Sequence, residues 1–154
     1  MNKRINDKHG MTGTSEYYSF HKMKARTLNT KDRAYKYYGG RGITMDSRYL
    51  GRNGFSNFFE DVGKKPNKNM SIDRIDNSKG YVKGNIRWAT PKEQSRNRRS
   101  NHLITFRGET KTITEWSEIA KIKQRTLWQR INIYNWSVEK AITTPTRHTS
   151  RLFI

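Results

Sequence analysis

The first part of the chain contains two segments in which apolar side chains recur at helical spacing. Between residues 54 and 62 they stand at positions 55, 58, 59 and 62, which predicts a short helix that Gly63 and Pro66 end. A similar spacing from Tyr17 predicts an earlier helix that begins at Ser15, with the serine as its cap. Glycines at 39, 40 and 42 then mark a tight turn between these helices.

The middle of the chain alternates apolar and polar residues. Residues 70–75 and 85–90 predict two short strands, separated by a turn at 76–80 that is rich in Asp, Asn and Gly. Thr90, Pro91 and Glu93 then form the signature of a capped helix. Residues 70 to about 99 therefore read as strand, turn, strand and helix.

The last third predicts a hairpin followed by short helices. Residues 103–113 alternate around Arg107-Gly108, and Thr114 is the expected cap of the next helix. Residues 124–131 predict a second helix with Leu127, Trp128 and Ile131 inward, and residues 137–142 a third. Three short helices in so few residues favour a helix-turn-helix module.

We thus expect an α+β fold with a small ββα core, flanking helices, and a carboxy-terminal hairpin and helix-turn-helix. The expected divisions are 1–102 for the first domain, 103–146 for the module and 147–154 for a tail.

The net charge of the chain indicates more about its partner than hydropathy does. The chain has 154 residues, of which 32 are Lys or Arg and 13 are Asp or Glu, for a net charge of +19. With aromatic residues at 12%, this favours a folded protein that binds a polyanion, and double-stranded DNA is the expected partner. A homodimer stays open as an alternative to a monomer.

The composition excludes several classes of protein and of site. The chain has no cysteine, so it holds no disulfide, no Cys-ligated zinc and no thiol nucleophile. No stretch approaches the roughly 20 apolar residues of a membrane span, and the first 30 residues lack the apolar centre of a signal peptide. We expect no membrane partner and a cytoplasmic protein, in the host cell cytoplasm if a phage encodes it.

The segment from Asp73-Arg74-Ile75-Asp76 through Gly80-Tyr81 and Asn85 to Glu93-Gln94 resembles the ββα metal finger of HNH endonucleases. The match covers about 30 residues. The resemblance implies that Asp73 is the first metal ligand, that Asn85 ties the loop to the finger, and that Gln94 occupies the ligand position on the helix. Oxygen ligands suit Mg²⁺, with Mn²⁺ as an alternative, and no zinc is expected.

Arg74 departs from the family pattern, because most relatives have the general-base histidine there. A guanidinium has a pKa above about 12 and cannot accept a proton at neutral pH, although it could clamp the scissile phosphate. Tyr81, His21 and His9 are the candidates for activating water. The simpler alternatives are an Asx turn for Asp73, an exposed helix position for Gln94, and a contact with backbone phosphate or a surface ion pair for Arg74.

Basic and amide side chains predict the DNA contacts. Residues 96–99 favour phosphate contacts, and the helix at 124–130 would lie in the major groove. The candidates are Arg41, Arg87, Arg96, Arg98, Arg99, Lys123, Gln124, Arg125, Gln129 and Arg130. The role of residues 1–62 stays open.

The sequence thus favours a site-specific, metal-dependent DNA endonuclease of the phage or mobile-element type. The alternative is a non-catalytic DNA-binding or host-takeover protein that keeps the finger as a scaffold, and an RNA or ribosome binder is a third interpretation.

Overall fold

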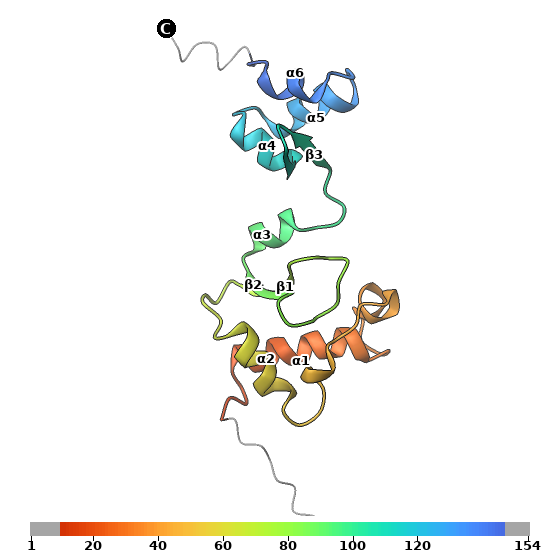
Figure 1. The fold of residues 1–154 in the computed structure, drawn as a ribbon, viewed down its shortest axis with the longest axis vertical. Helices are drawn as coiled ribbons and strands as arrows, with labels where there is room; N and C mark the ends of the chain where they lie inside the picture. Colours follow the sequence, from red (N-terminus) through yellow and green to blue (C-terminus); the bar gives the residue numbers. More distant parts are fainter. Residues whose placement is uncertain (1–9, 147–154) are drawn as a thin grey trace, which may run out of the picture. The chain divides into compact units, whose positions relative to one another are not determined.

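The computed structural model describes residues 10–146, so the candidate base His9 and the expected tail at 147–154 lie outside the described part. The fold is α+β, as predicted, with helices and two separate two-stranded antiparallel sheets. The chain divides into two compact units, one ending at Arg98 and one beginning at Arg99 (Figure 1). No helix of the described part is long and apolar enough to cross a membrane.

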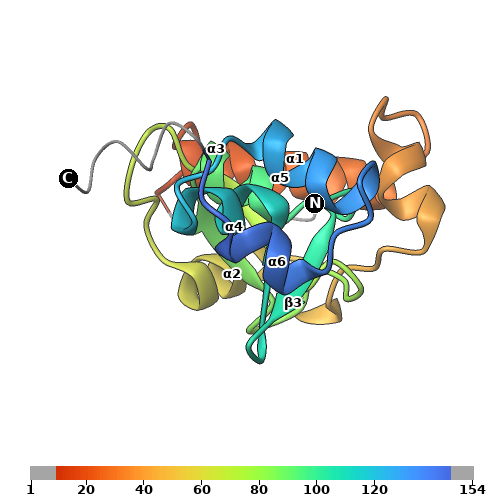
Figure 2. The same ribbon diagram turned by 90° about the horizontal axis from the view of Figure 1, so that it is seen from above.

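The first unit begins with α1 (Ser15–Leu28). Its cap is Thr14 and not Ser15, because the Thr14 hydroxyl accepts a hydrogen bond from the Tyr17 N–H. Phe20 and Met23 of α1 are buried in the core. The 3-10 turns η1 (Tyr35–Tyr37) and η2 (Gly39–Arg41) pack beside the carboxy-terminal end of α1 (Figure 2).

Helix α2 (Gly54–Val62) has the predicted bounds and follows the 3-10 turn η3 (Ser47–Tyr49). Phe55 and Phe58 are buried against Phe20, with ring centroids 5.7 and 5.3 Å from the Phe20 ring. This aromatic cluster joins α2 to α1 and supports the finger from one side.

The finger consists of β1 (Ser71–Arg74), β2 (Ile86–Ala89) and α3 (Pro91–Arg96). In the antiparallel register Asp73 stands opposite Arg87. The predicted capping box is confirmed, because the Thr90 hydroxyl accepts from the Glu93 N–H while the Glu93 carboxylate accepts from the Thr90 N–H. A local signal therefore fixes the start of α3 directly after β2.

Two glycines bring distant segments together around the finger. A Cβ at Gly39 would lie 2.1 Å from the Thr27 carbonyl oxygen, and one at Gly80 would lie 2.5 Å from that of Thr44. Both distances are too short for any larger residue. Because neither position carries a side chain, the neighbouring tyrosines can approach α1 and the finger. These tyrosines are Tyr38, directly before Gly39, and Tyr81, directly after Gly80.

The second unit contains β3 (Leu103–Phe106), β4 (Glu109–Thr112), α4 (Ile113–Ile119), α5 (Gln124–Asn132) and α6 (Val138–Thr143). The hairpin turns at Arg107 and Gly108, which both have positive φ. The cap of α4 is Thr112, not Thr114, because Thr112 and Glu115 form a capping box directly after β4.

The core of the second unit includes Ile104, Trp116, Leu127 and Ala141. Trp128 was predicted to point inward with Leu127, but its side chain is 44% exposed. Neighbouring helix positions differ by about 100° around the axis, so both cannot face one core.

Candidate active site

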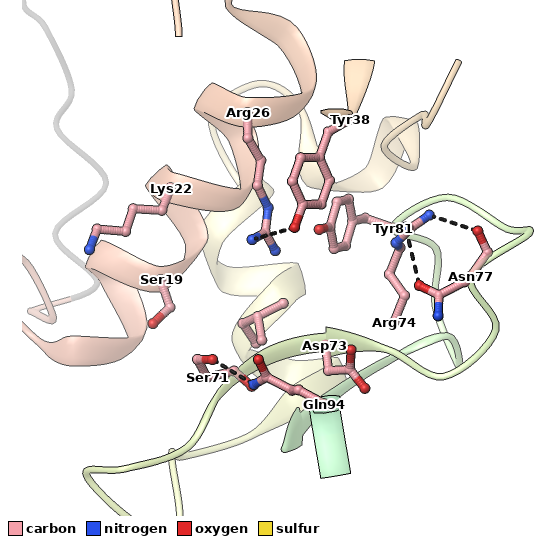
Figure 3. Close-up of a pocket in the computed structure, with 11 residues that line it drawn as sticks. Ser19, Lys22, Arg26, Tyr38, Ser71, Asp73, Arg74, Asn77, Tyr81 and Gln94 are labelled. Carbon is pink, nitrogen blue, oxygen red and sulfur yellow. Dashed lines mark hydrogen bonds between the residues drawn. The ribbon is translucent and has the colours of Figure 1, made fainter. Parts of the chain in front are cut away.

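A pocket opens in the first unit where α1, the glycine-rich turn, β1 and α3 meet (Figure 3). Its volume is about 170 Å³. Three positions of α1 and the whole of β1 contribute to its walls. The lining residues are Ser19, Lys22, Arg26, Tyr38, Ser71, Ile72, Asp73, Arg74, Asn77, Tyr81 and Gln94.

Asp73 supplies the pocket's only carboxylate. Its Oδ2 accepts hydrogen bonds from Nε and Nη2 of Arg87, at 3.2 and 3.1 Å, and from Nδ2 of Asn97, at 3.0 Å. The other oxygen, Oδ1, accepts none from residues 10–146. One edge of the carboxylate is thus oriented by the protein, and the other is available to a ligand.

Asn97 is the site residue that sequence reasoning missed. It follows the last turn of α3 as its carboxy-terminal cap, and its Nδ2 also donates to the Arg74 carbonyl at 2.5 Å. The Asn97 carbonyl in turn accepts from Nδ2 of Asn77. Asparagine is a common cap at helix ends, and here that signal was hidden because residues 96–99 were interpreted only as a phosphate-binding run.

Gln94, predicted as the ligand on the helix, has a different set of contacts. Its Nε2 donates to the Ser71 hydroxyl at 2.6 Å and to the carbonyls of Ser71 and Ala89. These bonds hold α3 against the strands. Gln94 lines the pocket, but among the described contacts Asn97, and not Gln94, reaches Asp73.

Asn85 is buried and joins the two ends of the loop between β1 and β2. Its Oδ1 accepts from the Asp76 N–H at 2.8 Å, while its Nδ2 donates to the carbonyls of Asp76 and Gly80. The loop therefore leaves β1 and returns to β2 in one defined conformation, with Asp73 at its base.

Arg74 is 8% exposed and lies under the same loop. Its Nη1 donates to the carbonyls of Asn77 and Lys79, and its Nη2 to Oδ1 of Asn77. Three of its five N–H groups are consequently bound to the turn, as Figure 3 shows for Asn77. The surface ion pair considered for Arg74 is not found, because this guanidinium is buried and hydrogen-bonded to backbone.

Neither described candidate for the water-activating base meets the chemical need. Tyr81 lines the pocket, but burial raises its pKa to about 12, so the phenol stays protonated at neutral pH. The His21 ring lies against Tyr17 in a tilted arrangement, with centroids 4.3 Å apart, and lines a second groove on α1 that shares Lys22 and Arg26 with the pocket. The structure does not bring His21 into the pocket of Asp73.

The donors in the pocket suit a hard cation that keeps much of its own water. No group of three or more His, Cys, Asp or Glu side chains occurs within residues 10–146, so a cation would bind only through a few protein oxygens. Oδ2 of Asp73 is already held by Asn97 Nδ2 at 3.0 Å and by Arg87, so the carboxylate oxygen available to a cation is Oδ1, and Asn97 orients the carboxylate.

The predicted DNA contacts of the first unit fall into two groups. Arg41 and Arg98 are exposed, as is Arg99 at the start of the second unit. Arg87 is ion-paired with Asp73 at 3.1 Å, and Arg96 is half-buried. Arg87 therefore orients the site carboxylate in addition to any contact with phosphate.

In the second unit, Lys123, Gln124 and Arg125 at the start of α5 are exposed, and Gln129 is half-buried. The prediction for Arg130 was wrong. Its side chain is buried, and its guanidinium donates to the carbonyls of Ala141, Thr144 and Pro145 at the end of α6. A guanidinium used in this way cannot read base edges.

Comparisons with protein-family models, curated proteins and solved structures gave no match. The assignment of a function therefore depends on the geometry and charge of this pocket and on the exposed side chains of α5.

Proposed function

We propose that this protein is a metal-dependent, site-specific DNA endonuclease that hydrolyses phosphodiester bonds. The observation that carries the proposal is Asp73 at the end of a strand–strand–helix finger, with Oδ2 held by Asn97 and Arg87, in a pocket whose other charged described side chains are cationic. A carboxylate can hold a hard cation, and the cationic walls favour a phosphate beside it.

In this proposal Oδ1 of Asp73 holds Mg²⁺ or Mn²⁺, while Asn97 and Arg87 orient the carboxylate through Oδ2. The bound cation would act as a Lewis acid for the phosphodiester and lower the pKa of a bound water. Asn85 and Arg74 keep the loop of the finger fixed, so the ligand edge of Asp73 faces the pocket.

The described residues of the pocket include no histidine. We therefore expect His21→Ala to cleave DNA at the rate of the parent protein. A large loss of cleavage in His21→Ala, with an unchanged melting temperature, would show that His21 reaches the site in the DNA complex.

Double-stranded DNA is the proposed substrate, and the start of α5 is the proposed reading surface. Exposed Gln and Arg side chains can bind base edges in the major groove. With a net charge of +19, we expect affinity for DNA to fall by roughly 10³- to 10⁵-fold between 50 and 200 mM salt, if 6 to 10 phosphates are contacted.

The direct test is incubation of supercoiled plasmid and phage genomic DNA with the protein in Mg²⁺, in Mn²⁺ and in EDTA. We expect metal-dependent cleavage by the parent and by Asp76→Asn, whose carboxylate lies in an exposed turn bonded to Ser78, and none by Asp73→Asn. Cleavage by Asp73→Asn at the parent rate would contradict the metal assignment.

A second candidate is a non-catalytic DNA-binding protein that uses the finger as a scaffold. Two observations favour it: Asp73 is already ion-paired with Arg87, and no histidine accompanies it among the described residues of the pocket. DNA binding without cleavage in either metal, on every substrate tested, would select this function.

A further inference from the structure

Helix α1 contributes a cationic wall to the pocket, although it lies far from the finger in sequence. Lys22 and Arg26 both line the pocket and are one helical turn apart, a rise of about 6 Å. In Figure 3 the Arg26 guanidinium points into the pocket, while the Lys22 amine extends away along the helix. Arg26 is therefore an inner cation and Lys22 a cation at the rim.

Two tyrosines hold the Arg26 guanidinium in place. Its central carbon lies 4.4 Å from the ring centroid of Tyr38 and 5.1 Å from that of Tyr81, and the two rings are stacked on one another. Nη1 donates to the Tyr38 hydroxyl at 3.5 Å, the outer limit of a hydrogen bond. Aromatic contacts thus orient the guanidinium without using many of its N–H groups.

Arg26 has an N–H group that no described residue binds. Its Nε is buried and has no hydrogen-bond partner within residues 10–146, and none of the carboxylates in that range forms an ion pair with it. A buried donor without a partner is costly, and a bound ligand is one way in which a protein satisfies such a group. A guanidinium fork can bind two oxygens of one phosphate.

Arg74 lies near the same two rings, at 5.9 Å from Tyr38 and 5.5 Å from Tyr81, but it differs in its hydrogen bonds. Three of its N–H groups are used by the loop at 77–79. Of the two arginines, Arg26 is therefore the one whose donors are available to a ligand.

The charges of the pocket point to an anion. The carboxylate of Asp73 is balanced by Arg87, so among the described residues that line the pocket Lys22, Arg26 and Arg74 have no compensating acid, although Asp32 lines the adjoining groove with Lys22 and Arg26. A volume of about 170 Å³ corresponds to roughly five or six waters, which is enough for a phosphate group and part of the hydration of a cation.

We propose that Arg26 of α1 is the residue that binds the phosphodiester group in the pocket, with Lys22 at the rim contacting the same DNA strand. The inference rests on the proposed nuclease function and gives the amino-terminal segment a task, namely to complete the pocket of the finger. Arg74 is then a positioning residue that acts through the loop.

The test compares Arg26→Gln and Lys22→Gln with Lys24→Gln. Lys24 carries the same charge on the same helix but does not line the pocket, so it is the matched control. Binding of a fluorescent 20-base-pair duplex is measured by anisotropy in EDTA over a range of salt concentrations, and cleavage is measured separately in Mg²⁺.

We expect Arg26→Gln and Lys22→Gln each to reduce the slope of log affinity against log salt by about one, while Lys24→Gln keeps the slope of the parent. Arg26→Gln should also lower kcat/KM by roughly 10- to 100-fold, as expected for a lost charge-assisted hydrogen bond. Inorganic phosphate, at a concentration equal to that of the DNA phosphates, should not displace the duplex.

Salt slopes of Arg26→Gln and Lys22→Gln equal to that of Lys24→Gln would overturn the proposal. Displacement by an equal concentration of inorganic phosphate would overturn the assignment to a DNA strand. Because the binding measurement needs no cleavage, a protein that never cuts DNA would refute the nuclease function while the salt slopes still decide the role of Arg26. Lys22 is exposed, so its variant keeps the test valid if Arg26→Gln fails to fold.

Discussion

Nδ2 of Asn97 donates to Oδ2 of Asp73 at 3.0 Å, which joins the end of α3 to the end of β1. The two residues are 24 positions apart in sequence. This contact fixes the orientation of the Asp73 carboxylate at the pocket, and it can be tested separately from Gln94.

Asn97→Ala should raise the Mg²⁺ concentration needed for half-maximal cleavage and lower the rate by roughly 10- to 100-fold, because the metal-binding carboxylate loses its orienting group. The measurement is plasmid cleavage over a Mg²⁺ titration. An unchanged Mg²⁺ dependence in Asn97→Ala would show that this side chain does not orient the carboxylate that holds the metal.

Asn85→Ala should destabilise the first unit by about 2–4 kcal/mol, because three buried hydrogen bonds to the loop are lost together. Urea unfolding gives the free energy of unfolding. The matched control is Asn67→Ala, which removes one exposed bond to the Asn69 N–H and should cost less than about 1 kcal/mol. Equal losses in the two variants would contradict the role assigned to Asn85.

Substitutions at Arg130 and Arg125 of α5 should affect different properties. The first should change the stability of the fold, and the second should change DNA binding. Arg130→Met leaves the carbonyls of Ala141 and Thr144 without their donor and should cost about 1–3 kcal/mol of stability. Arg125→Gln, at an exposed position, should leave stability within about 0.5 kcal/mol but weaken sequence-specific binding. Urea unfolding measures stability, and anisotropy with a target duplex measures binding. A loss of stability in Arg125→Gln but not in Arg130→Met would refute the burial of Arg130.

Acid stability should depend on Asp61, whose side chain is 4% exposed. Burial raises the pKa of this carboxyl, but the Tyr49 hydroxyl, Lys83 and Arg48 outweigh burial, so the folded-state pKa lies below its ordinary value. A lowered pKa stabilises the fold above the unfolded-state pKa of about 3.9, and this contribution is lost as the pH falls through the folded-state value.

Asp61→Asn should therefore lower the free energy of unfolding at pH 7. Below about pH 4, where the parent loses stability as Asp61 is protonated, the variant should lose less. Urea unfolding at several pH values measures this. Glu60→Gln is the control, because Glu60 also pairs with Arg48 but is 71% exposed and should change little. A parent-like pH profile in Asp61→Asn would exclude Asp61 as the group responsible.

The fold class and several elements could be read from the sequence because their signals are local. The bounds of α2, the capping box of Thr90 and Glu93, and the turn at Arg107-Gly108 depend on neighbours within a few residues. The two errors in helix caps were of one or two positions, at Thr14 for Ser15 and at Thr112 for Thr114, since adjacent Thr and Ser residues offer equivalent caps.

Tertiary structure decided which polar side chains form the site. Asn97 reaches Asp73 only because α3 folds back onto β1, and Arg26 faces the finger only because α1 packs beside it. The same is true of Arg130, whose partners at the end of α6 are 11 to 15 residues away, and of Tyr81, whose burial raises its pKa. Sequence thus determined residue types and local elements, whereas contacts between distant segments determined which charges are buried, paired or left for a ligand.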